Sequence, residues 1–338
     1  MNKHVVFITP GFPKNEEDTT CIPALQFYAK ALKEDGVKIS VVSIHYPFQK
    51  DAYLWHGIEV FPLNGQNKKF RTRQLRRKAL QKVKDIHDRD NVDVIHSFWL
   101  HETTRVASAV SKSLNIPLIA TAMGQEMRNP KPSFKRWKKS DFTIVALSDF
   151  QADALRKKGV EPSAIVPWGI HEVTPVAKTT DLICVANLIP LKNVKYFVAI
   201  CAEIVKTKPD LIAKIVGDGP LASNLQNQIS DLGIQENVEL LGELTYEESQ
   251  TCITTSQVLI HPSQFEGFGM VIIEALAAGT HVIANPVGIA QQLEIPFLTG
   301  NISADAAMVQ VQLKSASPEP IVFDIKDTVS QYKSIYGF

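Results

Sequence analysis

The chain has 338 residues, of which 45% are hydrophobic, and a formal net charge of +1. This length and apolar content allow a sizeable core, favour two domains over one, and exclude a chain that is disordered throughout. The near-neutral charge excludes the strongly basic signature of a dedicated nucleic-acid-binding protein, so we expect no nucleic-acid partner.

The cysteines and the N-terminal residues indicate the cellular compartment in which we expect the protein. Cys21, Cys184, Cys201 and Cys252 are far apart and form no CxxC pair, which predicts free thiols, no zinc site and a cytoplasmic setting. The chain starts with a strand-like run rather than a signal-peptide core. No stretch approaches about 18 uninterrupted apolar residues, so we expect no membrane-spanning helix.

Short β-branched runs alternate with helical patterns along the whole chain. This βαβ order predicts parallel sheets, and its return in the second half predicts an α/β protein with two doubly wound, Rossmann-like domains. The predicted strands are Val5–Thr9, Ile39–Ile44, Ile58–Pro62, Val92–His96, Leu118–Thr121 and Phe142–Leu147, followed by Leu182–Ala186, Ala213–Val216, Val238–Leu241, Val258–His261 and His281–Ala284.

A linker-like segment separates the two predicted domains. Val166–His171 leads into a stretch containing Thr, Pro and Lys that ends near Thr180. This composition is typical of a connection between domains. We place the boundary near Gly169, so that the first domain covers residues 1–168 and the second covers residues 169–323.

The last residues return to regular structure. Ile321–Phe323 has the composition of a short strand. Residues 324–338 follow it with the pattern of an amphipathic helix, which carries apolar side chains on one side. We expect this C-terminal helix to pack back onto the first domain.

The most informative segment, His261–Gly279, combines a strand end, a glycine-bearing loop and an apolar helix. Gly267 and Gly269 allow backbone geometries that direct amide groups at an anion, and a helix N-terminus also favours negative charge. Glu274 lies one turn into the helix, where an unpaired carboxylate is costly and a ribose diol would supply two donors. Glu266 precedes the glycines at the mouth of the loop. Together these residues predict a site for a diphosphate and a ribose.

A simpler interpretation of the same spacing is a tight turn followed by a partly exposed Glu274, since two glutamates at this spacing are common in acidic helices. The surrounding residues favour the site, because the whole segment resembles the EGFG–E signature of retaining glycosyltransferase family 4. This resemblance implies the GT-B architecture, in which two Rossmann-like domains face a central cleft. It also implies that Glu274 holds the nucleotide ribose and Glu266 contacts the donor sugar. The amides that would approach the phosphates belong to Gly267, Phe268, Gly269 and Met270.

Two further segments of the second half carry the resemblance. Ile183–Asn193 is similar to the family's strand and loop that usually read VGRL, followed by a lysine and a glycine. Lys192 keeps the lysine, where a cation would neutralise the diphosphate, whereas Asn187 replaces the usual arginine and removes one positive charge. Ile215–Leu221 matches the family's VGDGP turn. Gly217 in this turn would shape the wall near the nucleotide base, and a structural role is favoured over direct contact because Gly-Asp-Gly-Pro is ordinary turn chemistry.

The first half resembles the family less uniformly. The loop around Gly11 is similar to the glycine-bearing loop beside the acceptor and donor phosphates, although Cys21 stands where a glycine is common. The strand end that reads DVIHSFWLH resembles the family's DVIHxHW pattern. There we expect His96 to be a packed strand residue rather than a catalyst, while Trp99 and His101 line the acceptor side.

One departure from the family follows the predicted strand Leu118–Thr121. Many relatives carry a histidine here that is associated with catalysis, but the matching residue is Met123, which cannot transfer a proton and is assigned to the acceptor side. Glu126 aligns with the acidic residue of the same motif and is expected to accept hydrogen bonds from the donor sugar or the acceptor. A retaining transfer in which the leaving diphosphate takes the acceptor's proton does not require the histidine. The catalytic candidates are therefore Glu266, Lys192 and Glu126.

A basic segment, residues 67–84, has two interpretations. It is either a solvated helix face or a dock for anionic lipid headgroups or an anionic acceptor, as an amphipathic interfacial helix would provide. Lys135–Lys139 pairs basic and aromatic residues in the same way. Because related enzymes often act on lipid-linked acceptors, we expect peripheral attachment at the inner membrane face. The basic residues of the segment are Lys68, Lys69, Arg71, Arg73, Arg76, Arg77, Lys78, Lys82 and Lys84.

These features together predict a retaining, metal-independent, hexosyltransferase-like enzyme. It would move a sugar from a UDP- or GDP-linked donor to a glycan or lipid-linked acceptor in polysaccharide or glycolipid synthesis. We expect no cofactor besides the nucleotide-sugar, which is a co-substrate, and no metal, because the sequence has no DxD run in a suitable loop. Two alternatives stay open, because fold alone does not decide the reaction. One is a sugar-nucleotide epimerase of the same architecture, and the other is a catalytically silent nucleotide-sugar-binding paralogue, which Met123 and Asn187 suggest.

Overall fold

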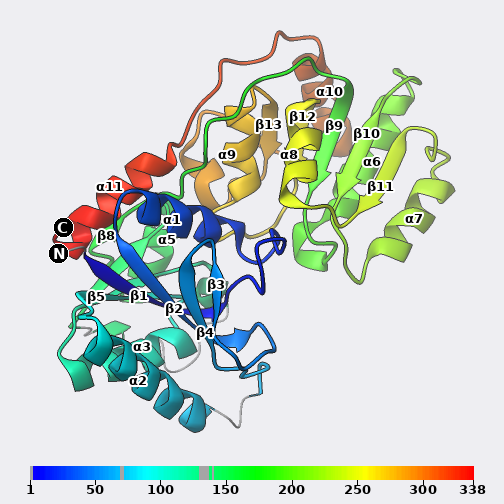
Figure 1. The fold of residues 1–338 in the computed structure, drawn as a ribbon. Helices are drawn as coiled ribbons and strands as arrows, with labels where there is room; N and C mark the ends of the chain where they lie inside the picture. The colour runs from blue at the N-terminus through cyan, green and yellow to red at the C-terminus, as the bar shows by residue number, and fades with distance from the viewer. Residues whose placement is uncertain (1–2, 69–71, 129–136, 139–140) are drawn as a thin grey trace. The chain divides into compact units, whose positions relative to one another are not determined.

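A computed structural model describes residues 3–68, 72–128, 137–138 and 141–338 (Figure 1). The chain divides into two compact units. Unit 1 comprises Met1–Gly169 together with Asp324–Phe338, and unit 2 comprises Ile170–Phe323. Each unit contains its own sheet with helices packed against it, so the expected class of two α/β parallel-sheet domains is confirmed.

The described residues of unit 1 form an eight-stranded sheet in the order β3-β4-β2-β1-β5-β6-β7-β8. All neighbours in this sheet are parallel except β3 and β4. The central strands are almost continuously apolar because both of their faces are buried. The strands are β1 (His4–Gly11), β2 (Lys38–Tyr46), β3 (Tyr53–Trp55), β4 (Ile58–Pro62), β5 (Val94–Phe98), β6 (Leu118–Thr121), β7 (Thr143–Ala146) and β8 (Ala164–Ile165).

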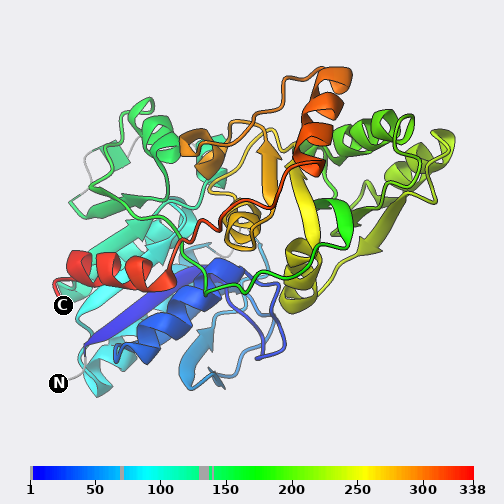
Figure 2. The same cartoon turned by 90° about the horizontal axis from the view of Figure 1, so that it is seen from above.

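Helices cover the sheet of unit 1. They are α1 (Pro23–Glu34), α2 (Thr72–Arg89), α3 (Glu102–Leu114), α4 (Gln125–Arg128), α5 (Asp149–Arg156) and α11 (Ile325–Tyr336). The C-terminal helix α11 packs beside α1 (Figure 2).

A buried polar network joins α11 to the sheet of unit 1. The Tyr336 hydroxyl lies 2.6 Å from His96 Nδ1 and 2.6 Å from the Tyr28 hydroxyl. His96 Nε2 lies 2.8 Å from Thr121 Oγ1, which in turn lies 2.8 Å from the Tyr332 hydroxyl. His96 is fully buried, and burial holds its pKa well below the usual range. The prediction that His96 is a packed strand residue is therefore confirmed.

The basic segment forms most of α2. The apolar side chains of this helix, Leu75, Ala79, Val83 and Ile86, are buried in the core of unit 1. They are not available for insertion into a bilayer, so the interfacial-helix form of the membrane interpretation is wrong. Any membrane contact of α2 would use charge alone. Lys69, Arg71, Lys135, Arg136 and Lys139 lie outside the described residues.

The described residues of unit 2 form a five-stranded parallel sheet in the order β11-β10-β9-β12-β13. Helices α6, α7 and α10 pack on one face, and α8 and α9 pack on the other (Figure 2). The strands are β9 (Thr180–Val185), β10 (Ala213–Val216), β11 (Val238–Gly242), β12 (Ser256–His261) and β13 (His281–Ala284). The helices are α6 (Val194–Val205), α7 (Ala222–Asp231), α8 (Tyr246–Thr254), α9 (Met270–Ala277) and α10 (Ile302–Leu313), with short 3₁₀ turns η3 (Pro190–Lys192) and η4 (Gly288–Gln292).

The predicted strand at Ile321–Phe323 is wrong. These residues pair with no strand, and Ile321 and Val322 are 48% and 50% exposed. The amide of Ile321 donates to the carbonyl oxygen of Leu276 near the end of α9, at 3.2 Å. The segment has the composition of a strand, but it runs past a helix end instead of a neighbouring strand that would complete a hydrogen-bond ladder.

Candidate functional site

The predicted donor residues of unit 2 lie where the strand order of its sheet reverses. Strands β9 and β12 are neighbours, whereas the strands that follow them in sequence lie on opposite sides. In open α/β sheets, the loops at the carboxyl ends of two such strands form the usual ligand site. Lys192 follows β9, and Glu266 follows β12.

Glu266 is the centre of a charged cluster. Its Oε1 atom lies 2.5 Å from Lys192 Nζ and 2.8 Å from His261 Nε2, and both glutamate and histidine side chains are largely buried. Burial alone would raise the pKa of Glu266, but the hydrogen bond with His261 and the charge of Lys192 lower it to about 2. Glu266 is therefore an ionised hydrogen-bond acceptor throughout the physiological pH range.

The loop that carries Glu266 is held by backbone and amide contacts. Asn285 Nδ2 donates to the carbonyl oxygens of Pro262 and Ser263, at 2.9 and 3.1 Å. The amide of Ile289 donates to the carbonyl oxygen of Phe268 at 2.7 Å. A β-carbon at Gly288 would lie 2.2 Å from that oxygen, so only glycine allows this approach. These contacts fix the loop before any ligand arrives.

The N-terminus of α9 lies beside this charged cluster in the sequence and in the fold. Gly269, with φ of 98°, precedes Met270, the first residue of the helix, and has no side chain with which to cap it. The first amide groups of a helix have no partner within the helix, and the macrodipole adds positive potential there. Residues 267–270 thus present the backbone expected near an anion.

Glu274 lies one turn further along α9 and is only 6% exposed. The interpretation of Glu274 as a partly exposed helix residue is therefore wrong. Burial raises its pKa to about 7, and Tyr246 and Gln250 of α8 offset this rise only in part. An ionised Glu274 without a further donor is costly in this position.

The turn after β10 packs closely on the loop after β9. Gly217 has φ of 128°, and a β-carbon there would lie 2.0 Å from the carbonyl oxygen of Ala186. The amide of Leu188 donates to the carbonyl oxygen of Asp218 at 2.9 Å. This packing explains the glycine without a ligand. Asn187, in the same loop, is exposed.

In unit 1, the strand order reverses between β1 and β5. The predicted donor residue Gly11 ends β1, whereas the predicted acceptor residues Trp99 and His101 follow β5 and Met123 follows β6. Gly11 is buried, and its carbonyl oxygen accepts a hydrogen bond from Thr9 Oγ1. Trp99 has φ of 69°, and its amide donates to the carbonyl oxygen of Thr121. His101 Nδ1 accepts a hydrogen bond from the amide of Glu102 at 2.7 Å and so caps α3.

Glu126 ties together the loops that follow β5 and β6. Its Oε1 atom accepts hydrogen bonds from the amides of Leu100 and Met123, at 3.0 and 2.8 Å. The residue is 4% exposed, and burial raises its pKa against the effect of these backbone donors. The side chain of Met123 is partly exposed at the same loop. The structure thus gives Glu126 a loop-positioning role, and its contact with a sugar stays a prediction.

Sequence reasoning missed four residues of the unit 2 site. His261 could have been singled out, because it ends the strand that precedes Glu266 and is a ready partner for a carboxylate. Tyr246, Gln250 and Asn285 carry no such signal, because tertiary packing alone brings them to α9 and its loop.

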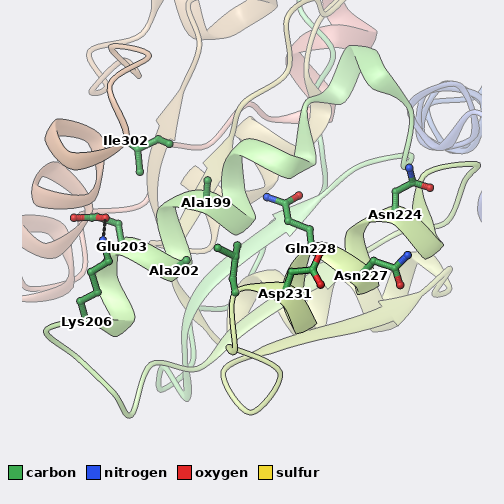
Figure 3. A pocket seen from close by; sticks show the side chains of 10 residues that line it. Ala199, Ala202, Glu203, Lys206, Asn224, Asn227, Gln228, Asp231 and Ile302 are labelled. Atoms are coloured by element: carbon green, nitrogen blue, oxygen red, sulfur yellow. Dashed lines mark hydrogen bonds and ion pairs between the residues drawn. The ribbon is translucent and has the colours of Figure 1, made fainter.

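A separate groove of about 550 Å³ lies between α6 and α7 on the helical surface of unit 2 (Figure 3). Small and apolar side chains such as Ala199, Ala202 and Ile302 line it together with amide and charged groups such as Asn227 and Asp231. None of the predicted site residues lines this groove.

Two family models match the chain. The model described as Glycosyltransferase Family 4 matches residues 25–172, and the model described as Glycosyl transferases group 1 matches residues 170–311. The two matches meet at the junction of units 1 and 2 and together cover most of the chain.

Individual relatives agree with the models. An uncharacterized glycosyltransferase of Methanocaldococcus jannaschii is 26% identical over 230 residues, which are 65% of this chain and 64% of that protein. A GDP-mannose-dependent alpha-(1-6)-phosphatidylinositol monomannoside mannosyltransferase of Mycolicibacterium smegmatis is 30% identical over 128 residues, 36% of this chain and 34% of that protein. The matches therefore span less than two thirds of these relatives. Among solved structures, sucrose-phosphate synthase of Thermosynechococcus elongatus has a TM-score of 0.80 at 16% identity and covers 100% of this chain and 98% of its own.

Proposed function

Because this chain belongs to the group 1 glycosyltransferases of family 4, and its two α/β units have the GT-B fold, we propose that it transfers a sugar from a nucleotide-sugar to an acceptor hydroxyl with retention of configuration. The observation that carries this proposal is the cluster of Lys192, Glu266 and His261 beside the uncapped start of α9. It combines a cation and the amides at a helix N-terminus for a diphosphate with an ionised acceptor for sugar hydroxyls.

The donor binds unit 2 in this proposal. The ribose diol donates hydrogen bonds to Glu274, and the backbone of residues 267–270 receives the diphosphate. Lys192 Nζ has three donors, so it can contact a phosphate oxygen while it keeps its bond to Glu266. Gly217 and Asn187 lie in the adjoining loops and border the nucleotide. Glu266, held by His261, accepts hydrogen bonds from the sugar.

The transfer step breaks the bond between the anomeric carbon and the diphosphate oxygen and forms a bond to the acceptor oxygen on the same face. The acceptor's proton passes to the departing diphosphate oxygen, so no side-chain base is needed at Met123. Lys192 and the amides of α9 stabilise the charge that develops on the leaving group. No metal ion is required for that role, and the described residues contain no cluster of three potential metal ligands.

The acceptor binds unit 1 in this proposal, at the loops that carry Trp99, His101 and Met123, with Glu126 holding these loops in place. Gly11 is assigned to donor binding. The matched Mycolicibacterium enzyme is named for a phosphatidylinositol mannoside acceptor and GDP-mannose, which supports a lipid-linked or glycan acceptor and makes GDP-mannose the first donor to test.

Attachment to an anionic membrane surface on the cytoplasmic side is part of the proposal. The first half of α2 exposes Arg73, Arg76, Arg77 and Lys78, while its apolar side is buried. Positive charge near a surface of anionic lipids contributes attraction without insertion. Among the described helices, none is long and apolar enough to cross a bilayer.

The test is to incubate the protein with GDP-mannose and a panel of UDP- and GDP-sugars, with and without a lipid extract, and to follow nucleotide release. Nucleotide release that requires the acceptor is the expected result. Isomerisation of a nucleotide-sugar without acceptor would replace the proposal with an epimerase. Saturable binding without turnover would identify a catalytically silent paralogue, for which the substitutions at Met123 and Asn187 would then account.

A further inference from the structure

Two side chains of α8 face Glu274. Tyr246 and Gln250 are four residues apart and therefore share one face of the helix. Helices α8 and α9 pack against each other, and burial together with the neighbouring Glu274 carboxylate raises the pKa of the Tyr246 hydroxyl. The three side chains thus form one polar group between α8 and α9.

The amide of Gln250 is buried in this group. Neither its Nε2 nor its Oε1 atom makes a hydrogen bond of normal geometry, although the amide approaches Glu274 closely enough to affect its pKa. An amide can donate from nitrogen to an ionised carboxylate or accept at oxygen from a protonated one, and a tyrosine hydroxyl can do the same. Tyr246 and Gln250 can therefore complement Glu274 in both of its protonation states.

The charges around Glu274 do not favour its ionised form in the empty protein. The charged residues of α8 are Glu247 and Glu248, which are both acidic. On the β12 side, His261 is engaged with Glu266, and on β13, His281 lies 2.9 Å from the carbonyl oxygen of Ala316. Within the described part of the chain, no cation lowers the pKa of Glu274, in contrast to Glu266.

We propose that Glu274, buried between α8 and α9 with no cation beside it among the described residues, is protonated in the empty site and ionised when a ribose diol is bound, so that nucleotide-sugar binding releases a proton to the solvent. Tyr246 and Gln250 are positioning residues in this proposal, because they hold the carboxyl group in place and donate to its ionised form. The inference rests on the proposed function, because it assumes that the ribose lies at Glu274. The two diol hydroxyls then add their donors to those of Tyr246 and Gln250, so that the ionised carboxylate is fully hydrogen-bonded.

The ionisation of Glu274 sets the direction in which nucleotide-sugar affinity changes with pH. With a pKa of about 7 in the empty protein, Glu274 is ionised above that pH and can accept both diol hydroxyls at once. Below it, the proton must leave first, so affinity falls as the pH falls. Between pH 8 and pH 6 the affinity should drop about tenfold, and about half a proton should be released per nucleotide-sugar at pH 7.

The experiment is isothermal titration of GDP-mannose and of UDP-glucose into the full chain at pH 6 to 9, in pairs of buffers with different ionisation enthalpies. Nucleotide-sugars are used because their diphosphate is doubly esterified and does not titrate in this range. The difference in heat between two buffers gives the number of protons released. We expect release that is greatest at pH 6 and absent at pH 9.

Gln250→Met and Tyr246→Phe separate positioning from simple structural support. Each variant should lose several-fold in affinity at pH 7, move the release of protons to higher pH, and approach the wild-type affinity at pH 9, where Glu274 is ionised in any case. A merely structural role would weaken binding equally at every pH. Gln226→Met, which changes an exposed glutamine of α7, is the matched control and should behave as wild type.

The titrations distinguish a failure of this inference from a failure of the proposed function. Tight nucleotide-sugar binding with no buffer dependence from pH 6 to 9 would overturn the inference and leave the proposed function standing. Uptake of a proton on binding would also overturn it, because uptake points to a group that an anion stabilises in its protonated form. Absence of binding for every nucleotide-sugar would overturn the proposed function and this inference with it.

Discussion

Lys192 and Glu266 are 74 residues apart in the sequence, yet Lys192 Nζ lies 2.5 Å from Glu266 Oε1. The pair joins the two loops that flank the reversal of strand order in unit 2. A second backbone contact supports it, since the amide of Gln264 donates to the carbonyl oxygen of Leu191 at 2.9 Å. The loops after β9 and β12 therefore form one charged, rigid surface at the carboxyl end of the sheet.

Lys192→Met should weaken the binding of nucleoside diphosphates. The variant keeps the length of the side chain but removes a cation whose hydrogen bonds to charged groups contribute about 1.5–3 kcal/mol each, which is roughly 10- to 150-fold in affinity. Titration calorimetry with GDP and UDP measures the loss. Lys195→Met changes an exposed lysine three residues further along the chain, in α6, and should leave affinity unchanged. Equal affinity in the two variants would remove Lys192 from the diphosphate site.

Glu266→Gln should impair turnover more than nucleotide binding. The substitution keeps a hydrogen-bonding group of the same size but removes the negative charge that His261 and Lys192 stabilise. Losing one charge-stabilising contact in a transition state typically costs roughly a hundredfold or more in rate. The test compares kcat of the variant with its affinity for the nucleoside diphosphate, using exposed Glu243→Gln as control. A variant with normal kcat would show that Glu266 does not contact the reacting sugar.

Much of the fold could be predicted from the sequence, because buried parallel strands are nearly continuous β-branched runs. Val258–His261, Ala213–Val216 and His281–Ala284 were found for this reason, within two residues of the observed bounds. Ile321–Phe323 has the same composition but no neighbouring strand, and composition does not report the absence of a partner. The short strand β8 was missed because two residues carry no periodic signal.

Some residues of the candidate site could likewise be predicted from the sequence, and others could not. Glu266 and Glu274 were found because a local pattern of glycines and apolar residues surrounds them. Tyr246 and Gln250 reach Glu274 only through the packing of α8 on α9, which no local pattern encodes. The pKa values of the two glutamates differ for that reason too, since Lys192 reaches Glu266, and Tyr246 and Gln250 reach Glu274, from distant segments.

Gly217→Ala should destabilise unit 2. The added β-carbon would lie 2.0 Å from the carbonyl oxygen of Ala186, and φ of 128° is unfavourable for alanine. We expect a loss of roughly 2–4 kcal/mol in the free energy of unfolding, as for a backbone clash combined with strain. Gly233→Ala is the matched control, because φ is 68° there but nothing lies within 4 Å of the new carbon. It should cost about 1 kcal/mol. Urea unfolding of both variants compares the two effects, and equal losses would mean that the loop of Ala186 moves aside freely.

Replacing Arg73, Arg76 and Arg77 of α2 with glutamine should reduce binding to anionic vesicles. Their charges are exposed, while the helix keeps its buried residues Leu75 and Ala79, so the fold should persist. Each basic residue near such a surface contributes about 1 kcal/mol. Sedimentation with vesicles of neutral lipid, or with added anionic lipid at low and high salt, measures the effect. Wild-type protein that binds both vesicle types equally would exclude electrostatic attachment through α2.

Glu274→Gln should stabilise the protein in the absence of nucleotide. The pKa of Glu274 is about 7 in the folded protein, against 4.5 for an ordinary glutamate. Below pH of about 4.5 both folded and unfolded chains carry the proton, so the carboxyl imposes no penalty. Between that pH and about 7 the unfolded chain ionises first, and the free energy of unfolding falls by up to about 3 kcal/mol. This penalty stays constant at higher pH.

Glutamine at position 274 removes the ionisation and keeps the size of the side chain. Urea unfolding at pH 4.5 and pH 8 should therefore show similar stability for wild type and variant at the lower pH and a more stable variant at the higher one, whereas exposed Glu243→Gln should show no such difference. If the variant were no more stable than wild type at pH 8, Glu274 would have found a donor within the empty protein, and its need for a ribose diol would disappear.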